Sequence, residues 1–286
     1  MRLLAAIVLA LSLALVACGD DDEPVDQQGA NESPAAGPSC EKADLETVND
    51  GVLTVGTDKP AFPPYFEDDD PTNGKGFESA VAYAIARELG FEQAEVEWTV
   101  VPFNASYRPG PKDFDFDVNQ ISIIPARTKR VDFSEPYYQA PQAVIAAKGS
   151  PAADATSLAD LKDVTIGVQI GTTSLDAVAA SIQPTTQPKV FDDSNAVVTA
   201  IKQDQVDAVV VDLPTALFLT AVELPNASIV GQFDAPGGDE WGALLEKDSP
   251  LTDCVNEAIA TLKESGELDE ITQRWMSESA DAPVLQ

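Results

Sequence analysis

Apolar residues follow two different periods along the first half of the chain. Residues 52–55 are apolar except for Thr54 and end at Gly56, which predicts a short buried strand. Over 77–89 apolar residues recur every four positions and Gly90 follows, so this stretch predicts a helix with a glycine C-cap. Residues 96–100 then alternate apolar with polar side chains, as a half-buried strand does. Strand, helix and strand in this order indicate an α/β unit.

An acidic run with a period of two occupies 113–118, where aspartates alternate with Phe114, Phe116 and Val118. We interpret it as a strand that ends near Ile121 and carries its aspartates on a solvated face. A calcium loop is the alternative, but the period of two and the aromatic residues between the aspartates favour the strand.

A second α/β unit is predicted after the polar break at 148–151. Its strands are expected at 164–168 and 206–211, and its helices at 175–181 and 195–205. Two more amphipathic helices close the chain, and their apolar faces contain Val255, Ile259 and Leu262, then Leu268, Ile271 and Trp275.

The first residues have the features of an export signal. Arg2 precedes an apolar run at 3–17, which is shorter than the roughly twenty residues that a membrane-spanning helix needs. The small residue before Cys18 resembles a bacterial lipobox, so we expect a signal peptide at 1–17 and lipidation of Cys18. An ordinary signal peptide with an incidental cysteine is the alternative. Residues 18–39 are polar and acidic, and they predict a disordered linker.

Composition narrows the possible partners. The chain has 17 Lys and Arg against 48 Asp and Glu, a formal charge of −31, and no His. Nucleic acid is therefore an implausible partner, because phosphate attraction needs a basic face. The same charge disfavours anionic lipid headgroups, so we expect membrane attachment through the lipid anchor only. No cofactor and no metal ion are expected.

Two cysteines remain besides Cys18, and they are Cys40 and Cys254. Export to an oxidising compartment permits one disulfide between them. Two unpaired thiols are the alternative. The bridge would be structural and would join the start of the folded region to a helix near its end.

Polar side chains follow the predicted strands, at the edge where ligands bind in open α/β sheets. Ser122 and Arg127 come after the predicted strand that contains Val118. The guanidinium of an arginine has a planar, forked set of donors that matches a carboxylate. A surface arginine is the alternative. Asp212 ends the strand at 206–211 and could meet an ammonium group or act as a helix N-cap.

A third place is formed by Thr172 and Thr173 after Gly171. The start of a helix here would be an anion site, and Thr173 with Asp176 could form a capping box. Both can hold, because they use different donors. Together the three places would bind both charged ends of a free amino acid.

The chain resembles the polar amino-acid-binding proteins of extracellular solute-binding protein family 3, from Gly51 to Met276. The segments that carry the resemblance are GVLTVGTD (51–58), FPPYFE (62–67), GFESAVAYAIARELG (76–90), PAR and VDFSEPYY (125–127 and 131–138), IGVQIGTTS (166–174), VDAVVVDLPTA (206–216) and EWG (240–242). The resemblance implies an α/β, two-lobed, periplasmic-binding-protein-like type II fold with two hinge strands. The first lobe would combine 40–142 with 233–280, and the second would be 143–232.

The same resemblance implies roles for the site residues. Arg127 would bind the ligand carboxylate with Ser122 and the threonines, and Asp212 would take the ammonium. Phe62 would cover the ligand as an aromatic lid, with core packing as the alternative. Asp58 would face the ligand side chain, where it suits a basic or amide group.

The sequence also departs from the family pattern. Ile124 stands where the family has a threonine, which removes a helix cap and a polar ligand contact. Asn119 and Gln120 stand where small residues are common, and the loop at 104–111 differs from that of a typical member. These departures bear on the identity of the ligand more than on the fold.

We therefore expect a binding protein, not an enzyme, that passes a small polar amino acid to the permease of an ABC transporter. It is expected to be a monomer held outside the cell membrane by lipid. A dehydratase-like enzyme on the same fold is one alternative, with Glu240 as its acid since the chain has no His. A ligand-binding sensor domain is the other.

Overall fold

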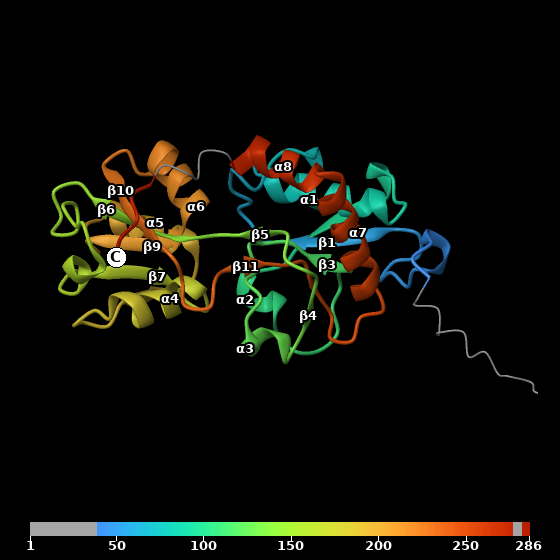
Figure 1. Ribbon diagram of the computed structural model, residues 1–286, viewed down its shortest axis with the longest axis horizontal. Helices are drawn as coiled ribbons and strands as arrows, with labels where there is room; N and C mark the ends of the chain where they lie inside the picture. The colour runs from blue at the N-terminus through green and yellow to red at the C-terminus, as the bar shows by residue number, and fades with distance from the viewer. Residues whose placement is uncertain (1–38, 277–281) are drawn as a thin grey trace, which may run out of the picture. The chain divides into compact units, whose positions relative to one another are not determined.

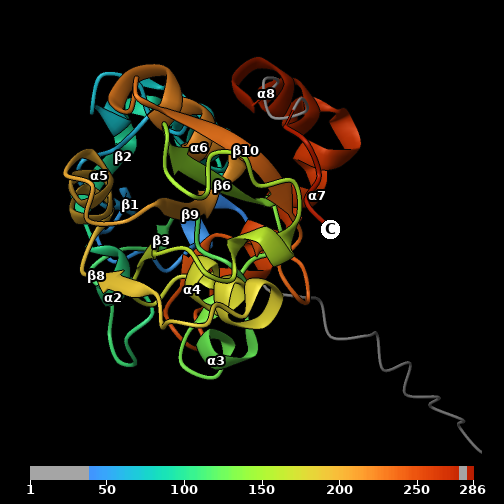
Figure 2. The ribbon, with the colours of Figure 1, turned by 90° about the vertical axis from the view of Figure 1, so that its left-hand side faces the viewer.

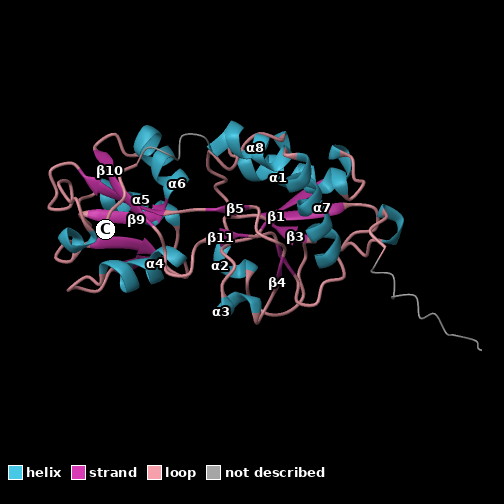
Figure 3. Cartoon of the chain, viewed as in Figure 1, coloured by secondary structure: helices cyan, strands magenta, loops and turns pink. Residues whose placement is uncertain are grey.

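The computed structural model describes residues 39–276 and 282–286. The predicted signal peptide, Cys18 and nearly all of the predicted linker lie outside the described residues. The described residues form two five-stranded sheets and one two-stranded sheet, flanked by helices (Figures 1 and 3).

The strands of these sheets occupy the following bounds. They are β1 (Leu53–Thr57), β2 (Val96–Val100), β3 (Phe116–Asp117), β4 (Asp132–Phe133), β5 (Tyr138–Gln139), β6 (Gln142–Ala147), β7 (Ile166–Gln169), β8 (Lys189–Phe191), β9 (Ala208–Asp212), β10 (Ala227–Phe233), β11 (Glu240–Trp241) and β12 (Leu244–Leu245). The α-helices are α1 (Phe77–Glu88), α2 (Phe103–Ser106), α3 (Pro125–Thr128), α4 (Thr173–Ala177), α5 (Ser194–Lys202), α6 (Leu213–Phe218), α7 (Thr252–Ser265) and α8 (Glu267–Met276).

The first sheet has the order β2-β1-β3-β12-β4, and we call it with α1, α7 and α8 the first lobe. Strand β1 pairs in parallel with β2 and β3, as the predicted strand-helix-strand unit requires. The spacing over 77–89 is confirmed by α1, whose inward side chains Phe77, Val81 and Ile85 are fully buried. Gly90 follows it with a φ of 83°, the left-handed conformation of a C-cap glycine. Helices α7 and α8 lie side by side over the same core (Figure 2).

The second sheet has the order β10-β6-β9-β7-β8, and we call it with α4, α5 and α6 the second lobe. Strand β9 is parallel to β7 and antiparallel to β6. Val210 packs into the core on the α4 side, and Val209 packs into the core on the side of α5 and α6. Helices therefore cover both faces, which explains why residues 208–211 form a continuous apolar run.

Two connections join the lobes. The chain passes from β5 to β6 and later returns from β10 to β11, and β5 pairs with β11 to form the two-stranded sheet (Figure 1). Both connections lie close together because β6 and β10 are neighbours in the second sheet. The last residues, 282–286, run beside β10.

The predicted solvated face at 113–118 is wrong for two of its aspartates. Asp113 is exposed, but Asp115 is 3% and Asp117 is 0% exposed. The strand is also shorter than predicted and covers only Phe116–Asp117. Strand β3 is the central strand of its sheet and is covered on both faces, so its period of two does not expose alternate residues.

Asp115 is buried because it serves the backbone. Its carboxylate accepts hydrogen bonds from the N–H of Thr54 at 2.6 Å and from the N–H of Val48 at 2.8 Å. Such bonds satisfy donors that neighbouring segments would otherwise leave unpaired. Among the described residues no group of His, Cys, Asp or Glu side chains is placed to hold a metal ion.

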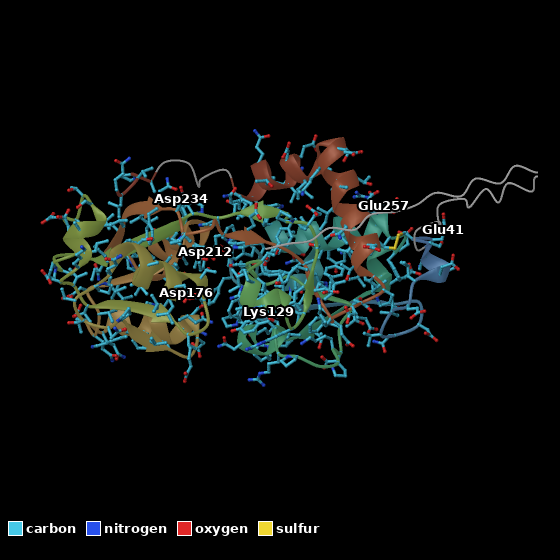
Figure 4. All side chains as sticks on the ribbon, turned by 60° about the horizontal axis from the view of Figure 1, so that its bottom comes forward. Glu41, Lys129, Asp176, Asp212, Asp234 and Glu257 are labelled. Carbon is cyan, nitrogen blue, oxygen red and sulfur yellow. A yellow bond between two sulfur atoms is a disulfide. The ribbon has the colours of Figure 1, made fainter. Side chains whose placement is uncertain are left out.

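The predicted disulfide is confirmed. Cys40 and Cys254 are bonded, with their Cα atoms 5.4 Å apart (Figure 4). The bond ties the start of the described chain to α7 in the first lobe. Among the described residues no helix has the length and apolar character needed to cross a membrane.

Candidate ligand-binding site

A cavity of about 400 Å³ lies between the two lobes. Its lining includes Thr57 at the end of β1, Gln169 at the end of β7 and Asp212 at the end of β9. The carboxyl ends of parallel strands from both sheets therefore meet at one cavity, which is where open α/β sheets bind ligands. Its volume falls in the range of roughly 300–1,000 Å³ that small-molecule sites occupy.

The structure brings the predicted ligand-binding residues together around this cavity, with one exception. The predicted residues that line it are Asp58, Phe62, Ser122, Thr172, Thr173 and Asp212. Arg127 does not line it, and lies behind Ser122 instead.

Arg127 is a buried side chain that joins the two lobes. It is 3% exposed, so the alternative of a surface arginine is excluded. Its Nη1 donates to the carbonyl of Ser122 at 2.8 Å, and its Nη2 donates to the carbonyl of Gly171 at 2.9 Å. The guanidinium carbon lies 5.3 Å from the ring centroid of Phe103 and 4.8 Å from that of Tyr107, which are cation–π distances. The unusual loop at 104–111 thus supplies part of the arginine's surroundings.

The threonines at the start of α4 have separate roles. Thr172 is the N-cap, and its hydroxyl accepts from the N–H of Leu175 at 3.3 Å. The suggested capping box of Thr173 with Asp176 is therefore not what caps α4. The hydroxyl of Thr173 donates to Oδ2 of Asp239 at 2.8 Å and lies 3.3 Å from the Ser122 hydroxyl of the other lobe.

Asp212 is linked to a second carboxylate. Nε2 of Gln142 donates to Oδ1 of Asp212 and to Oδ2 of Asp239, at 2.6 Å each. Burial raises the pKa of Asp212 well above its usual value, and the charge of Asp239 raises this pKa further. Asp212 occupies the N-cap position of α6, but within the described part its side chain makes no capping bond. The helix-cap alternative is therefore not realised.

Gln142 and Asp239 are buried residues in contact with the predicted site residues, and the sequence reasoning missed them. Gln142 is the first residue of β6, and Asp239 follows two glycines just before β11. Neither position has a periodic or motif signal. Their meeting depends on the two connections lying side by side, which only the folded chain shows.

An aromatic pair closes another part of the cavity. The ring of Phe62 lies 6.0 Å from the ring of Phe218, which belongs to α6 in the second lobe. A hydrogen bond of 2.8 Å between the hydroxyls of Tyr65 and Thr215 joins the lobes beside this pair. Phe62 is only half-buried and lines the cavity, so core packing is not its whole role.

Asp58 is positioned by backbone donors. Its Oδ1 accepts from the N–H of Lys59 at 2.7 Å, and its Oδ2 accepts from the N–H of Phe103 at 2.9 Å. These bonds hold the carboxylate at the end of β1, facing the cavity. Each oxygen keeps a lone pair for a ligand.

The departures at Asn119 and Gln120 connect the cavity to a buried carboxyl group. Gln120 lines the cavity with a φ of 50°, and its backbone N–H donates to Glu78 at 2.7 Å. Glu78 is fully buried and also accepts from the hydroxyl of Tyr137 at 2.6 Å. Burial raises the pKa of Glu78 to about 7. The sequence reasoning missed Glu78 because it lies inside a regular helix pattern.

The charged groups that line the cavity are mostly acidic. Among the described residues that line it, the carboxylates are Asp58, Asp192, Asp193 and Asp212, and Lys59 is the basic residue. Lys59 lies 3.6 Å from the carboxylate of Asp69, so its charge is partly compensated. Glu240, the acid considered for an enzyme, is exposed on β11 and does not belong to the described lining.

The comparison with family models identifies the class. Residues 53–278 match the model of the bacterial extracellular solute-binding proteins, family 3. The chain belongs to this family, and the two-lobed α/β fold predicted from the sequence is confirmed.

Individual relatives are more specific. The chain is 29% identical to the arginine-binding extracellular protein ArtP of Bacillus subtilis, over 79% of this chain and 86% of that protein. An ancestral arginine-binding protein, whose structure was solved with bound arginine, is 33% identical with a TM-score of 0.65. The match covers 79% of this chain and 98% of the ancestral protein's chain. The ancestral amino acid-binding protein AncCDT-1, a precursor of cyclohexadienyl dehydratase, is 29% identical, with a TM-score of 0.63, over 79% of this chain and 95% of its own.

Proposed function

We propose that this protein binds a free amino acid with a cationic side chain in the interlobe cavity and delivers it to the permease of an ABC transporter. The observation that carries the proposal is the acidic cavity at the strand ends of both lobes. Relatives named as amino-acid-binding proteins support the amino acid, and among them arginine-binding proteins support the cationic side chain.

The ammonium group is assigned to Asp212. It is the lining carboxylate at the end of β9, beside the connections between the lobes. A carboxylate with a raised pKa gains when a cation approaches, because the cation stabilises the ionised form.

The carboxylate group is assigned to Arg127 together with Ser122 and Thr173. A guanidinium has five N–H donors, and Nη2 of Arg127 donates a hydrogen bond to the neutral carbonyl of Gly171. A ligand carboxylate is a stronger acceptor than a carbonyl, so it replaces the Gly171 carbonyl at this donor when the ligand binds. The hydroxyls of Ser122 and Thr173 line the cavity at the same place.

The side chain is assigned to the acidic remainder of the lining. Asp58 faces the cavity, and Asp192 and Asp193 lie exposed in the same lining. A cationic side chain would be attracted by these charges, and an anionic one would be repelled. Phe62 with Phe218 would cover the ligand's apolar stem.

Calorimetric titration of the folded region with each standard amino acid tests this function. We expect arginine or lysine to bind best and glutamate and aspartate not at all. Asp212→Asn should lose roughly 10- to 100-fold in affinity, as the loss of a charged hydrogen bond implies. Asp154→Asn, which changes an exposed carboxylate of the second lobe outside the described lining, is the matched control and should bind normally. Equal affinity for acidic amino acids would contradict the cationic ligand.

A binding role without turnover is part of the proposal. The relatives named here are binding proteins, although AncCDT-1 is a precursor of a dehydratase. Recovery of the ligand unchanged after prolonged incubation is the expected result, and any product would favour the enzyme.

The remaining expectations concern motion and place. We propose that the connections near Gln142 and Phe233 are the hinges, with 40–142 and 233–280 in one lobe and 143–232 in the other. We also propose a monomer held outside the membrane by lipid on Cys18. Cys18→Ala should release the protein from the membrane fraction of expressing cells.

A further inference from the structure

Asp239 is a buried carboxylate behind the proposed ammonium site. It lies in the connection from β10 to β11 and is 1% exposed. Its Oδ2 accepts from Nε2 of Gln142 at 2.6 Å and from the hydroxyl of Thr173 at 2.8 Å. Its Oδ1 has no hydrogen-bond partner among the described residues. Asp239 does not belong to the described lining of the cavity.

One amide group holds two carboxylates together. Gln142 is 0% exposed, and its two N–H bonds go to Asp212 on one side and Asp239 on the other. Its Oε1 is left without a partner in the described part of the chain. Because the two N–H groups of one amide donate to the two carboxylates, the carboxylates are held close together although their charges repel each other.

The surroundings do not balance this pair. The charged and titratable groups that face Asp212 are Asp239, Glu78, Arg127 and Tyr65. Arg127 is the cation among them, and it already donates to two backbone carbonyls. A further positive charge from a ligand would therefore relieve the repulsion within the pair.

We propose that Asp239 is a positioning residue for ammonium capture, which acts through Gln142 to hold Asp212 in place and to strengthen the negative potential at the cavity. The inference rests on the proposed function, because Asp212 must be the ammonium receptor. It also assigns a purpose to the two interlobe connections. Gln142 and Asp239 belong to different connections, so the pair assembles only where these lie side by side.

A purely structural role for Asp239 makes a different prediction. In that case the carboxylate only satisfies the donors of Gln142 and Thr173, and its loss would weaken ligand binding equally at every pH. As a positioning charge, Asp239 both attracts the ammonium and disfavours ionisation of Asp212. Loss of Asp239 should therefore weaken binding at high pH, where Asp212 is ionised, and favour binding at low pH, where it makes ionisation of Asp212 easier.

The experiment is a calorimetric titration with arginine and with glutamine between about pH 5 and about pH 7.5, where neither ligand changes its charge. Wild-type affinity should fall as the pH is lowered, because Asp212 must be ionised to bind an ammonium group. Asp239→Asn should bind about tenfold more weakly near the upper pH, the effect of roughly one charge interaction. It should lose less affinity on acidification, so the two curves converge or cross.

Asp234→Asn is the matched control. Asp234 is an exposed carboxylate in the same connection, and its substitution removes the same charge (Figure 4). This variant should follow the wild-type curve. Asp239→Ser also removes the charge, with a side chain of a different shape, and should show the same dependence of affinity on pH as Asp239→Asn. The test therefore needs only one of the two variants to be folded, as cooperative unfolding would show.

Three results would overturn the inference. The first is a wild-type affinity that does not change over this pH range, and the second is an affinity of Asp239→Asn equal to that of the wild type at every pH. The third is an affinity of Asp239→Asn that is lower than that of the wild type by the same factor at every pH. Failure of the wild-type protein to bind any amino acid would overturn the proposed function, and this inference with it. Binding by the wild type with parallel curves would overturn this inference alone.

Discussion

Glu78 shows at the scale of one residue how burial changes an ordinary carboxyl group. It lies in the first turn of α1, where an acidic residue is common at the helix start. In the fold it is fully buried, and burial raises its pKa from 4.5 to about 7. Its hydrogen bonds with Gln120 and Tyr137 lower this pKa, but burial has the larger effect.

This shift predicts a dependence of stability on pH. Between about pH 4.5 and about pH 7 the folded protein holds the proton of Glu78 more tightly than the unfolded chain. The contribution of Glu78 to the free energy of unfolding therefore falls as the pH rises through this window, by about 3 kcal/mol in total, and is constant above it.

Glu78→Gln should remove this dependence. The difference in free energy of unfolding between the variant and the wild type should change in favour of the variant by about 2.5 kcal/mol from about pH 5 to about pH 8. Urea denaturation at both values measures it. Glu88→Gln, an exposed position on the same helix, should show no such change. A difference for Glu78→Gln that is the same at both values would contradict the prediction.

Single residues also mark the limit of sequence reasoning about the site. Arg127 and Asp212 were predicted from their places after strands, and both are at the interlobe site. What the sequence did not indicate is that Arg127 is enclosed by Phe103 and Tyr107 behind the cavity wall. Side chains of an irregular loop have no period, so their contacts depend on the tertiary structure.

At the scale of elements, the edge strand β10 is covered by the end of the chain itself. The N–H of Gln232 donates to the carbonyl of Pro283 at 2.7 Å, and the N–H of Leu285 donates to the carbonyl of Gln232 at 2.8 Å. Leu285 is 4% exposed and belongs to the core of the second lobe. It packs on Gly231, where a Cβ atom would come within 2.5 Å of it. Covering an edge in this way protects it from pairing with other chains.

Leu285→Ala should therefore lower the free energy of unfolding by about 2–3 kcal/mol, as the loss of a buried leucine side chain does. Urea denaturation measures this value. Val284→Ala is the control, because Val284 is 65% exposed, and its effect should stay within about 0.5 kcal/mol. Equal effects of the two substitutions would show that the last residues do not contribute to the fold.

The elements themselves were predictable where a period was long and regular. Helix α1 and strands β1, β2 and β9 occur within a few residues of their predicted positions. The prediction for the acidic strand was wrong. A period of two does not distinguish a half-buried strand from a central strand whose polar residues are buried and hydrogen-bonded. The two-residue strands β4, β5, β11 and β12 are too short to show any period.

At the scale of the whole molecule, one covalent bond spans most of the described chain. Cys40 and Cys254 are 214 residues apart in sequence. Such a cross-link limits the unfolded chain more than the folded one, and native bridges of this kind contribute roughly 2–5 kcal/mol.

Replacing both cysteines by serine should lower the free energy of unfolding by about 2–5 kcal/mol. The affinity for the ligand should stay unchanged, because neither cysteine belongs to the described lining of the cavity. Urea denaturation and calorimetry measure the two quantities. A loss of affinity at unchanged stability would contradict the structural role of the bridge.

The sequence alone determined the longer periodic elements, the two α/β units and the polar residues at the strand ends, because these depend on local periodicity and on short motifs. The resemblance of ordered segments then specified the two-lobed fold. The tertiary structure decided which side chains share the cavity and which stand behind it. Contacts such as that of Gln142 with Asp212 and Asp239 join residues 70 and 97 positions apart. Only the packing of the two lobes brings such residues within hydrogen-bonding distance.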